Sequence, residues 1–243
     1  MKLPSKHLDW ITEVRRKELT PYVYQKTNGK VLTGPFAGMV IVPRTAYKDG
    51  LTTSKLLGLY EDELHDWVYD SVASKPDLVL NIGCAEGYYA VGFSRLLPNV
   101  AAIAIDINPK CNAVVGENIM ANVINGLDVH VQRTTCEWLE NRLILTERPM
   151  IVMDCQGTEM ELLDPGRVPS LAKTRVIVEC YNESADALIK RFSSTHTIER
   201  TESQYKDPYQ FDFLRELSDS DKWCLVSEDR PTSATWLYMV PNQ

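Results

Sequence analysis

The stretch Leu78-Val-Leu-Asn-Ile-Gly-Cys-Ala-Glu-Gly87 decides the fold of this chain. It opens with a short apolar run, Leu78–Ile82, which predicts a buried strand. A turn containing Gly83 and Gly87 follows, and apolar residues then return at helical spacing up to Leu97. A glycine turn between a strand and a helix lets the backbone approach a ligand closely. The stretch therefore predicts a ligand site at this bend.

Short apolar runs and helical segments of similar length alternate from Pro76 to Phe192. This alternation is typical of repeated βα units and a mainly parallel sheet. The predicted strands are Leu78–Ile82, Val100–Ile105, Val129–Gln132, Met150–Met153 and Arg175–Cys180, and the predicted helices are Tyr88–Leu97, Pro109–Val123, Cys136–Leu145, Glu159–Leu163 and Ala185–Phe192. The last third adds a weak strand near His196–Arg200, a helix near Phe211–Leu217 and a strand Trp236–Val240. We expect an α/β fold: a Rossmann-like, seven-stranded, mainly parallel sheet whose last strand is antiparallel, with helices on both faces.

The first part of the chain differs from this pattern. It predicts a helix, then a short hairpin around Met39–Val42, and then a helix from Tyr60 that ends before Pro76. We therefore expect residues 1–75 to form a helical and hairpin extension, and residues 76–243 to form the ligand-binding domain. The residues after Met1 soon become polar and no apolar run reaches membrane-spanning length, so we expect a cytoplasmic protein.

Composition narrows the possible partners. The chain has 243 residues, a hydrophobic content of 44% and a net charge of −7, with a sequence pI near 5.2. This acidic balance lacks the basic stripe that a nucleic-acid backbone requires, so we expect a small-molecule partner. The six cysteines are spread singly, which predicts reduced, buried thiols. The four histidines, His7, His65, His130 and His196, form no metal-type pair, and no metal site is predicted.

The glycine turn discriminates between cofactors. A dinucleotide fingerprint would need a third glycine at the position of Tyr88, which weakens an interpretation as an NAD site. The segment instead resembles the first motif of class I methyltransferases, an acidic residue followed by x-Gly-x-Gly-x-Gly. Asn81 stands at the acidic position and Ala85 at the middle glycine. The resemblance implies S-adenosylmethionine (SAM) as cofactor, held by Asn81, Gly83, Cys84, Ala85, Gly87 and Tyr88.

Two further segments are predicted to hold the nucleoside part. Asp106 ends the second apolar run, where its carboxylate can accept hydrogen bonds from both ribose hydroxyls, with Ile107 beside it. The alternative for Asp106 is a helix cap ahead of Pro109. In this architecture the segment after the third strand borders the adenine, which points to Glu137 and Trp138; Trp138 can equally be a core residue.

The segment that follows the fourth predicted strand, Met150–Met153, indicates where the methyl acceptor binds. It leaves a strand at Asp154 and turns through Gly157 into a helix that begins at Glu159. This stretch resembles the Asp-x-Glu-Gly-x-Glu motif of FkbM-type methyltransferases, with Gln156 in place of the first glutamate. Further agreement comes from residues 34–38, 56–61, 176–179 and 227–231. The resemblance implies transfer of a methyl group to a hydroxyl oxygen of a sugar or natural-product type of molecule.

Three carboxylates are candidates for catalysis. Asp154 is placed to orient or deprotonate the acceptor hydroxyl and also to border the cofactor, while Glu159 and Glu179 are second candidates. An amide such as Gln156 cannot take a proton, which argues against a metal-assisted mechanism. Glu159 has a structural alternative, since negative charge stabilises the first turn of a helix. Arg230 is expected to pair with Glu228 or with a substrate.

Two other functions stay open at the level of the sequence. The departures at Asn81, Ala85 and Gln156 also fit a SAM-binding scaffold without catalysis, and a Rossmann domain can serve an NAD-dependent oxidoreductase. Residues 1–75 are expected to cover the acceptor cleft or to mediate formation of a homodimer.

Overall fold

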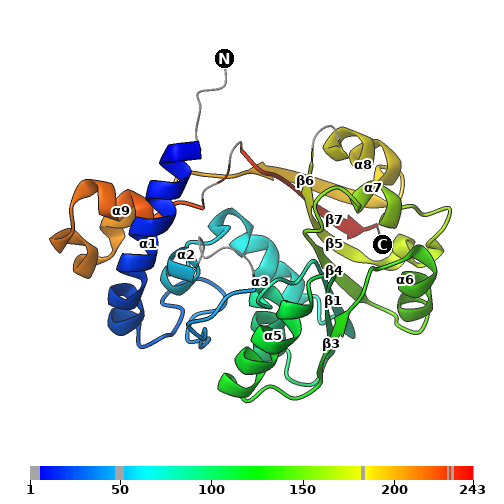
Figure 1. Cartoon of the computed structure of the whole chain (residues 1–243). Helices are drawn as coiled ribbons and strands as arrows, with labels where there is room; N and C mark the ends of the chain where they lie inside the picture. Colours follow the sequence, from blue (N-terminus) through cyan, green and yellow to red (C-terminus); the bar gives the residue numbers. More distant parts are fainter. Residues whose placement is uncertain (1–5, 47–51, 182–183, 229, 231–232, 243) are drawn as a thin grey trace.

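The computed structural model describes residues 6–46, 52–181, 184–228, 230 and 233–242, and its strands form one seven-stranded sheet (Figure 1). The strands are β1 (Leu78–Ile82), β2 (Ala101–Asp106), β3 (Leu127–Val131), β4 (Pro149–Met153), β5 (Arg175–Cys180), β6 (His196–Glu202) and β7 (Thr235–Pro241). Their order across the sheet is β3-β2-β1-β4-β5-β7-β6. The pairs among β1 to β5 are parallel, and β7 is antiparallel to both of its neighbours. The predicted fold class is confirmed.

Helices cover both faces of the sheet (Figure 1). The α-helices are α1 (Lys6–Thr27), α2 (Thr52–Leu57), α3 (His65–Ala73), α4 (Tyr88–Leu96), α5 (Pro109–Ala121), α6 (Cys136–Leu143), α7 (Glu159–Leu162), α8 (Ser184–Phe192) and α9 (Asp219–Val226). Short 3-10 helices are η1 (Asp62–Leu64), η2 (Pro169–Lys173), η3 (Pro208–Gln210) and η4 (Asp212–Glu216). One apolar core lies under α3, α4 and α5, and a second lies under α6, α7 and α8.

The central strands are apolar at almost every position because both of their faces are covered. All five residues of β1 are buried; Val79 faces the α3–α5 side, whereas Leu80 and Ile82 face the α6–α8 side. Asn81 is the polar exception in this strand and is 3% exposed. Its register partners are Ala104 in β2 and Val152 in β4, so it lies next to the switch point of the sheet.

The segment before the sheet departs from the prediction. The expected hairpin is present only in short form: one bridge joins Lys30 to Val40, and the Val31 amide donates to Met39 O at 2.9 Å. Side chains of α5 supply further hydrogen bonds to the second arm. Asn122 accepts from the Val40 amide at 2.8 Å and donates to its carbonyl at 2.8 Å, and Asn118 accepts from the Val42 amide at 2.9 Å. Tertiary contacts thus extend the short local pairing.

Two predicted helices were misplaced. The helix expected from Tyr60 begins at η1 and α3, because Glu61 has φ 50° in the left-handed region and interrupts it. The helix expected at Phe211–Leu217 is only the 3-10 helix η4, and η3 lies just before it. The α-helix of this region is α9, whose start is capped by the Ser218 hydroxyl accepting from the Asp221 amide at 3.2 Å.

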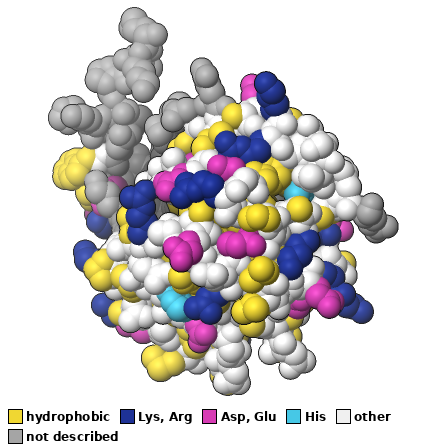
Figure 2. All heavy atoms as spheres, turned by 90° about the vertical axis from the view of Figure 1, so that its right-hand side faces the viewer, with side chains coloured by type: hydrophobic (Ala, Val, Ile, Leu, Met, Phe, Trp, Pro, Cys, Tyr) yellow, Lys and Arg dark blue, Asp and Glu magenta, His cyan; other side chains and the backbone are white. Residues whose placement is uncertain are grey.

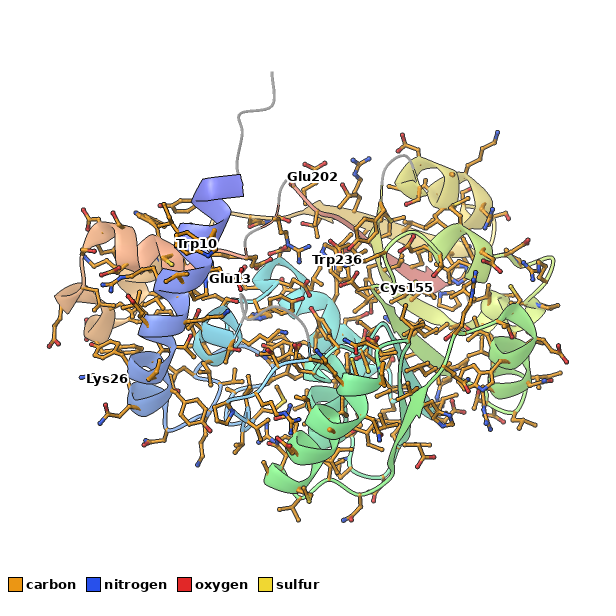
Figure 3. The ribbon with its side chains drawn as sticks, in the orientation of Figure 1. Trp10, Glu13, Lys26, Cys155, Glu202 and Trp236 are labelled. Carbon is orange, nitrogen blue, oxygen red and sulfur yellow. The ribbon has the colours of Figure 1, made fainter. Side chains whose placement is uncertain are left out.

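Helices α1 and α9 pack together beside α2, although they lie at opposite ends of the sequence (Figure 1). Arg15 donates to both oxygens of Asp221 at 2.7 and 2.8 Å, and the buried Arg16 donates to the Cys224 carbonyl at 3.0 Å. Figure 3 shows Trp10 and Glu13 on α1, away from the sheet. The apolar core of the α3–α5 side is continuous with residues of α1 and of α9. The division of the chain at residue 75 stays a prediction.

The outer face over α6, α7 and α8 is mixed in charge. Figure 2 shows Lys and Arg side chains interspersed there with Asp and Glu side chains. Within the described part of the chain, no helix has both the length and the apolar character needed to cross a membrane.

Candidate active site

The turn between β1 and α4 lies against the turn after β4. Gly83 has φ 78°, and a Cβ atom added to it would lie 1.7 Å from the Asp154 carbonyl oxygen. No side chain fits at that distance, so glycine is the one residue that this approach permits. Ala85 also has a left-handed φ of 46°. The two turns are joined to the sheet by hydrogen bonds from the Gly83 amide to Ile105 O at 2.9 Å and from the Asp154 amide to Ile82 O at 3.0 Å.

Asp106 connects the end of β2 to this turn. Its Oδ2 accepts from the Ala85 amide at 3.0 Å, and its Oδ1 accepts from the Asn108 amide at 2.8 Å. The capping role that was the alternative for Asp106 belongs to Asn108, whose side chain accepts from the Lys110 amide at the start of α5. Asp106 is 6% exposed, whereas the neighbouring Ile107 is 73% exposed. The structure therefore brings Asp106 to Gly83–Gly87, as the sequence predicted.

Asn81 leaves an unsatisfied acceptor at the same place. Its Nδ2 donates to the Val152 carbonyl at 3.4 Å, but its buried Oδ1 has no hydrogen-bond partner among the described residues. A buried amide oxygen without a partner is unfavourable by about 1–3 kcal/mol. A ligand that donates a hydrogen bond would remove this penalty.

Tyr88 and Cys84 face inward from the turn. The Tyr88 ring makes edge contacts with Phe36 and Tyr60, at centroid distances of 5.2 and 5.4 Å, and is 8% exposed. Burial raises the pKa of the Cys84 thiol above its usual range, so this side chain is an uncharged thiol at neutral pH. The assignment of both residues as cofactor contacts stays a prediction.

The segment after β3 lies at the same end of the sheet. Thr135 caps α6 by accepting from the Trp138 amide at 3.2 Å, and Glu137 is exposed on the first turn. The half-buried Trp138 ring lies 6.0 Å from the His130 ring and beneath the Arg142 guanidinium. Trp138 is thus half-buried and packs against the edge of the core under α6–α8. The contact of Glu137 and Trp138 with adenine stays a prediction.

Asp154 and Glu159 have different surroundings. Asp154, just beyond β4, is half-buried, and its Oδ1 accepts from the Tyr181 hydroxyl at 3.0 Å. Glu159 is 1% exposed and its Oε1 accepts from the Gly157 amide at 2.8 Å. Glu159 therefore shapes the turn that carries Asp154, in which Gln156 has φ 52°.

Glu179, at the end of β5, belongs to a cluster that we call the Arg230 cluster: Glu61, Glu179, Glu228 and Arg230. The guanidinium donates to Glu228 Oε2 at 2.7 Å, to Glu179 Oε1 at 2.5 Å and to Glu61 Oε1. The predicted pairing of Arg230 with Glu228 is confirmed. The same Arg230 joins the segment before η1 to the carboxyl end of β5.

A tyrosine links this cluster to Asp154. The Tyr181 hydroxyl lies 2.9 Å from Glu179 Oε2 and 3.0 Å from Asp154 Oδ1. A second one, Tyr89, donates to Glu61 Oε2. Trp236, the register partner of Glu179 in β7, is fully buried, and Figure 3 places it between the N-terminal helices and the sheet.

Burial controls the electrostatics of the cluster. It raises the pKa of Glu61 to about 7, an effect that Arg230 offsets only in part and that Glu228 increases. Burial, followed by the charge of Asp154, raises the pKa of Glu179 to about 8. Lys206 also reaches Glu228, and it pairs with Asp62 and Glu63. The cluster therefore holds more carboxylates than cations.

This excess of carboxylates predicts an unusual pH dependence of stability. The pKa of Glu61 is about 7 in the folded chain against an ordinary 4.5, so the folded state binds this proton more tightly. The resulting stabilisation is complete below about pH 4.5 and is lost as the pH rises through 7, by roughly 3 kcal/mol. In Glu61→Gln, which cannot titrate, the loss between pH 5 and 8 should shrink by the Glu61 share, while Glu179, with a pKa of about 8, keeps its own share.

Urea unfolding at several pH values measures this slope. The exposed Glu216, replaced by Gln, is the matched control and should keep the wild-type slope. An equally steep slope in Glu61→Gln and in the wild type would contradict the prediction.

Sequence reasoning missed Glu61 and Tyr181. Tyr181 follows the predicted strand Arg175–Cys180 directly, and its position at a strand end was a usable signal. Glu61 ends the segment 56–61 that agrees with the FkbM type, but its place in a predicted helix gave no reason to single it out as a site residue. The described residues contain no group of three or more His, Cys, Asp and Glu side chains arranged to hold a metal ion.

With its sheet order and its antiparallel β7, the chain has the Rossmann-like fold of class I SAM-dependent methyltransferases. The solved structure of a human methyltransferase 10 domain containing protein is similar over 94% of this chain and 97% of that chain, with a TM-score of 0.52 and 13% identity. A precorrin-6y C5,15-methyltransferase from Geobacter metallireducens is similar over 74% of this chain and 88% of that chain, with a TM-score of 0.48 and 11% identity. No family model and no curated protein matches the sequence. At these identities the likeness shows the fold alone.

Proposed function

We propose that this chain is a SAM-dependent methyltransferase of the FkbM type that methylates a hydroxyl oxygen of a small sugar or natural-product type of molecule. The observation that carries the proposal is the unpartnered, buried Asn81 Oδ1 beside a glycine turn that is pinned to Asp106. The carboxylate of Asp154 lies on the adjoining turn. The residues proposed to bind the cofactor and the proposed base thus lie at one end of the sheet.

The residues present fit the cofactor. Asn81 Oδ1 can accept from the ammonium of the methionine part, without the charge assistance that a carboxylate would give. Asp106 lies at the end of β2, where a carboxylate accepts from ribose hydroxyls. The exposed apolar surface of Ile107 and the half-buried Trp138 ring are suited to the adenine. When bound, SAM supplies a methyl group that is activated by a positively charged sulfur.

The chain's own task is positioning and proton transfer. Alignment of an acceptor oxygen with the methyl carbon supplies much of the rate in a displacement of this kind. Asp154 is half-buried, so it can reach an acceptor from outside, and it accepts the hydroxyl proton as a general base. Glu179 lies behind it and Glu159 holds its turn, which gives these two residues supporting roles.

Calorimetric titration with SAM and with S-adenosylhomocysteine tests the proposal. Both should bind saturably, and Asp106→Asn should weaken binding about tenfold to a hundredfold, since one charge-assisted acceptor is lost. The exposed Asp128 on β3, replaced by Asn, is the control and should bind normally. Failure of the folded wild type to bind either compound would refute the proposal, and displacement of them by NADH would favour an oxidoreductase.

Transfer of labelled methyl groups to hydroxylated sugars and natural products completes the test. Asp154→Ala should retain SAM binding while transfer slows about a hundredfold or more. An unchanged rate would remove Asp154 from the role of base. Turnover of any acceptor would eliminate the scaffold alternative.

A further inference from the structure

The Tyr181 hydroxyl faces two carboxyl groups at once. Its oxygen lies 3.0 Å from Asp154 Oδ1 and 2.9 Å from Glu179 Oε2. A phenol has one hydrogen to donate, although its oxygen can also accept. If both carboxyl groups were ionised, one of them would face the lone pairs of the phenolic oxygen without a proton between them. Both short contacts are hydrogen bonds only when one carboxyl group carries a proton.

Burial identifies Glu179 as the protonated partner, against the opposing effect of the Arg230 charge. Glu179 is 4% exposed, whereas Asp154 is half-buried and therefore better solvated. The ionised form of the more buried group is the more strongly disfavoured. Arg230 contacts Glu179 but is shared with Glu61 and Glu228, so one guanidinium serves three carboxyl groups.

The other titratable groups around Asp154 and Glu179 supply no further positive charge to the two carboxyl groups. Lys206 reaches Glu228, and its charge is divided between that residue, Asp62 and Glu63. Tyr60 and Tyr89 lie on the side of Glu61, and burial raises the pKa of both hydroxyls far above the neutral range, so they remain uncharged. The Asp154–Tyr181–Glu179 unit thus remains short of positive charge.

We propose that Tyr181 is a positioning residue for the base. The protonated Glu179 donates a hydrogen bond to the phenolic oxygen, and the Tyr181 hydroxyl donates a hydrogen bond to Asp154, which stays ionised. The role of this arrangement in catalysis rests on the proposed function, whereas the position of the proton does not. With the proton on Glu179, Asp154 keeps a carboxylate available at neutral pH. Its second oxygen, Oδ2, then takes the acceptor's hydroxyl proton, while the electron pair of the O–H bond stays on the acceptor oxygen.

Carbon-13 NMR of the full chain, labelled at the Asp and Glu carboxyl carbons and without any ligand, locates the proton. The Glu179 signal, assigned in the wild type through its connection to the backbone, should titrate above neutral pH. A Glu179 signal that titrates near pH 4.5 in the wild type would overturn the proposal, even if no variant folded.

Tyr181→Phe provides a readout that a merely structural hydroxyl would not move. Neutral Glu179 loses an acceptor, so its midpoint should fall by about one pH unit. A rise of this midpoint would mean that the hydroxyl donates to an ionised Glu179 and would overturn the proposal. Tyr205→Phe, at a tyrosine that is 76% exposed, is the control and should leave the Glu179 midpoint unchanged.

SAM titration of the same samples separates this inference from the proposed function. Absence of SAM binding together with the expected carboxyl titrations would refute the function and leave the proton arrangement standing. Normal SAM binding with Glu179 titrating near its ordinary value would refute the proton arrangement alone.

Discussion

Gly83→Ala is expected to abolish SAM binding and to destabilise the fold by more than about 4 kcal/mol. The added Cβ would lie 1.7 Å from the Asp154 carbonyl oxygen, a backbone atom that cannot move aside without displacing the turn after β4. That turn is tied to β1 by the hydrogen bond from the Asp154 amide to Ile82 O. The added methyl group would therefore push apart the two turns that form the proposed site.

Gly126→Ala is the matched control for this prediction. Gly126 has φ 82°, close to the φ 78° of Gly83, but an added Cβ would meet no atom within 4 Å. Only the left-handed conformation is then disfavoured, by about 1 kcal/mol. Urea unfolding and SAM titration measure both variants. Equal destabilisation by the two substitutions would show that backbone conformation, and not the contact with Asp154, is what requires glycine at Gly83.

Arg230→Met is expected to destabilise the chain by about 3 kcal/mol or more at pH 8. The substitution keeps an apolar stem and removes the charge that Glu61, Glu179 and Glu228 share. Carboxylates left buried without a cation are strongly unfavourable. Because protonation neutralises them, the destabilisation should shrink as the pH falls toward 5.

Arg200→Met provides the comparison for Arg230→Met. Arg200 also pairs with two carboxylates, Asp186 and Glu202, but its side chain is 44% exposed and both partners are exposed. This substitution should lower stability by less than about 1 kcal/mol at any pH between 5 and 8. In Arg230→Met combined with Glu61→Gln, part of the lost stability should return, since one buried charge is absent. A loss from Arg230→Met that is equal at pH 5 and pH 8 would contradict the account.

The sheet could be predicted because its signals are local. Each buried strand is a short apolar run, and each crossover helix repeats its apolar residues over one or two turns. The same holds for Gly83 and Asp106, which follow the first two strands directly. Parallel strands bring their carboxyl ends to one edge, so residues at these ends meet without further information.

The elements that differ from the prediction depend on distant side chains. The hairpin is shorter than expected, and Asn118 and Asn122 of α5 accept from the Val42 and Val40 amides of its second arm. Glu61 has the spacing of a helix, but it adopts a left-handed φ of 50°. Its carboxylate contacts Arg230, which lies 169 residues further along the chain. No local pattern encodes such partners.

The sequence by itself determined the strand-turn-helix at Leu78–Leu96, the position of Asp106 and the emergence of Asp154 at the adjoining strand end. These follow from apolar periodicity and from glycine, which act between residues close in the chain. Only the tertiary structure decided that Glu61, Tyr181 and Arg230 meet behind Asp154. Their meeting depends on how the N-terminal segment and the segment before β7 fold over the sheet. Burial there, and not spacing in the sequence, decides which carboxyl groups stay ionised.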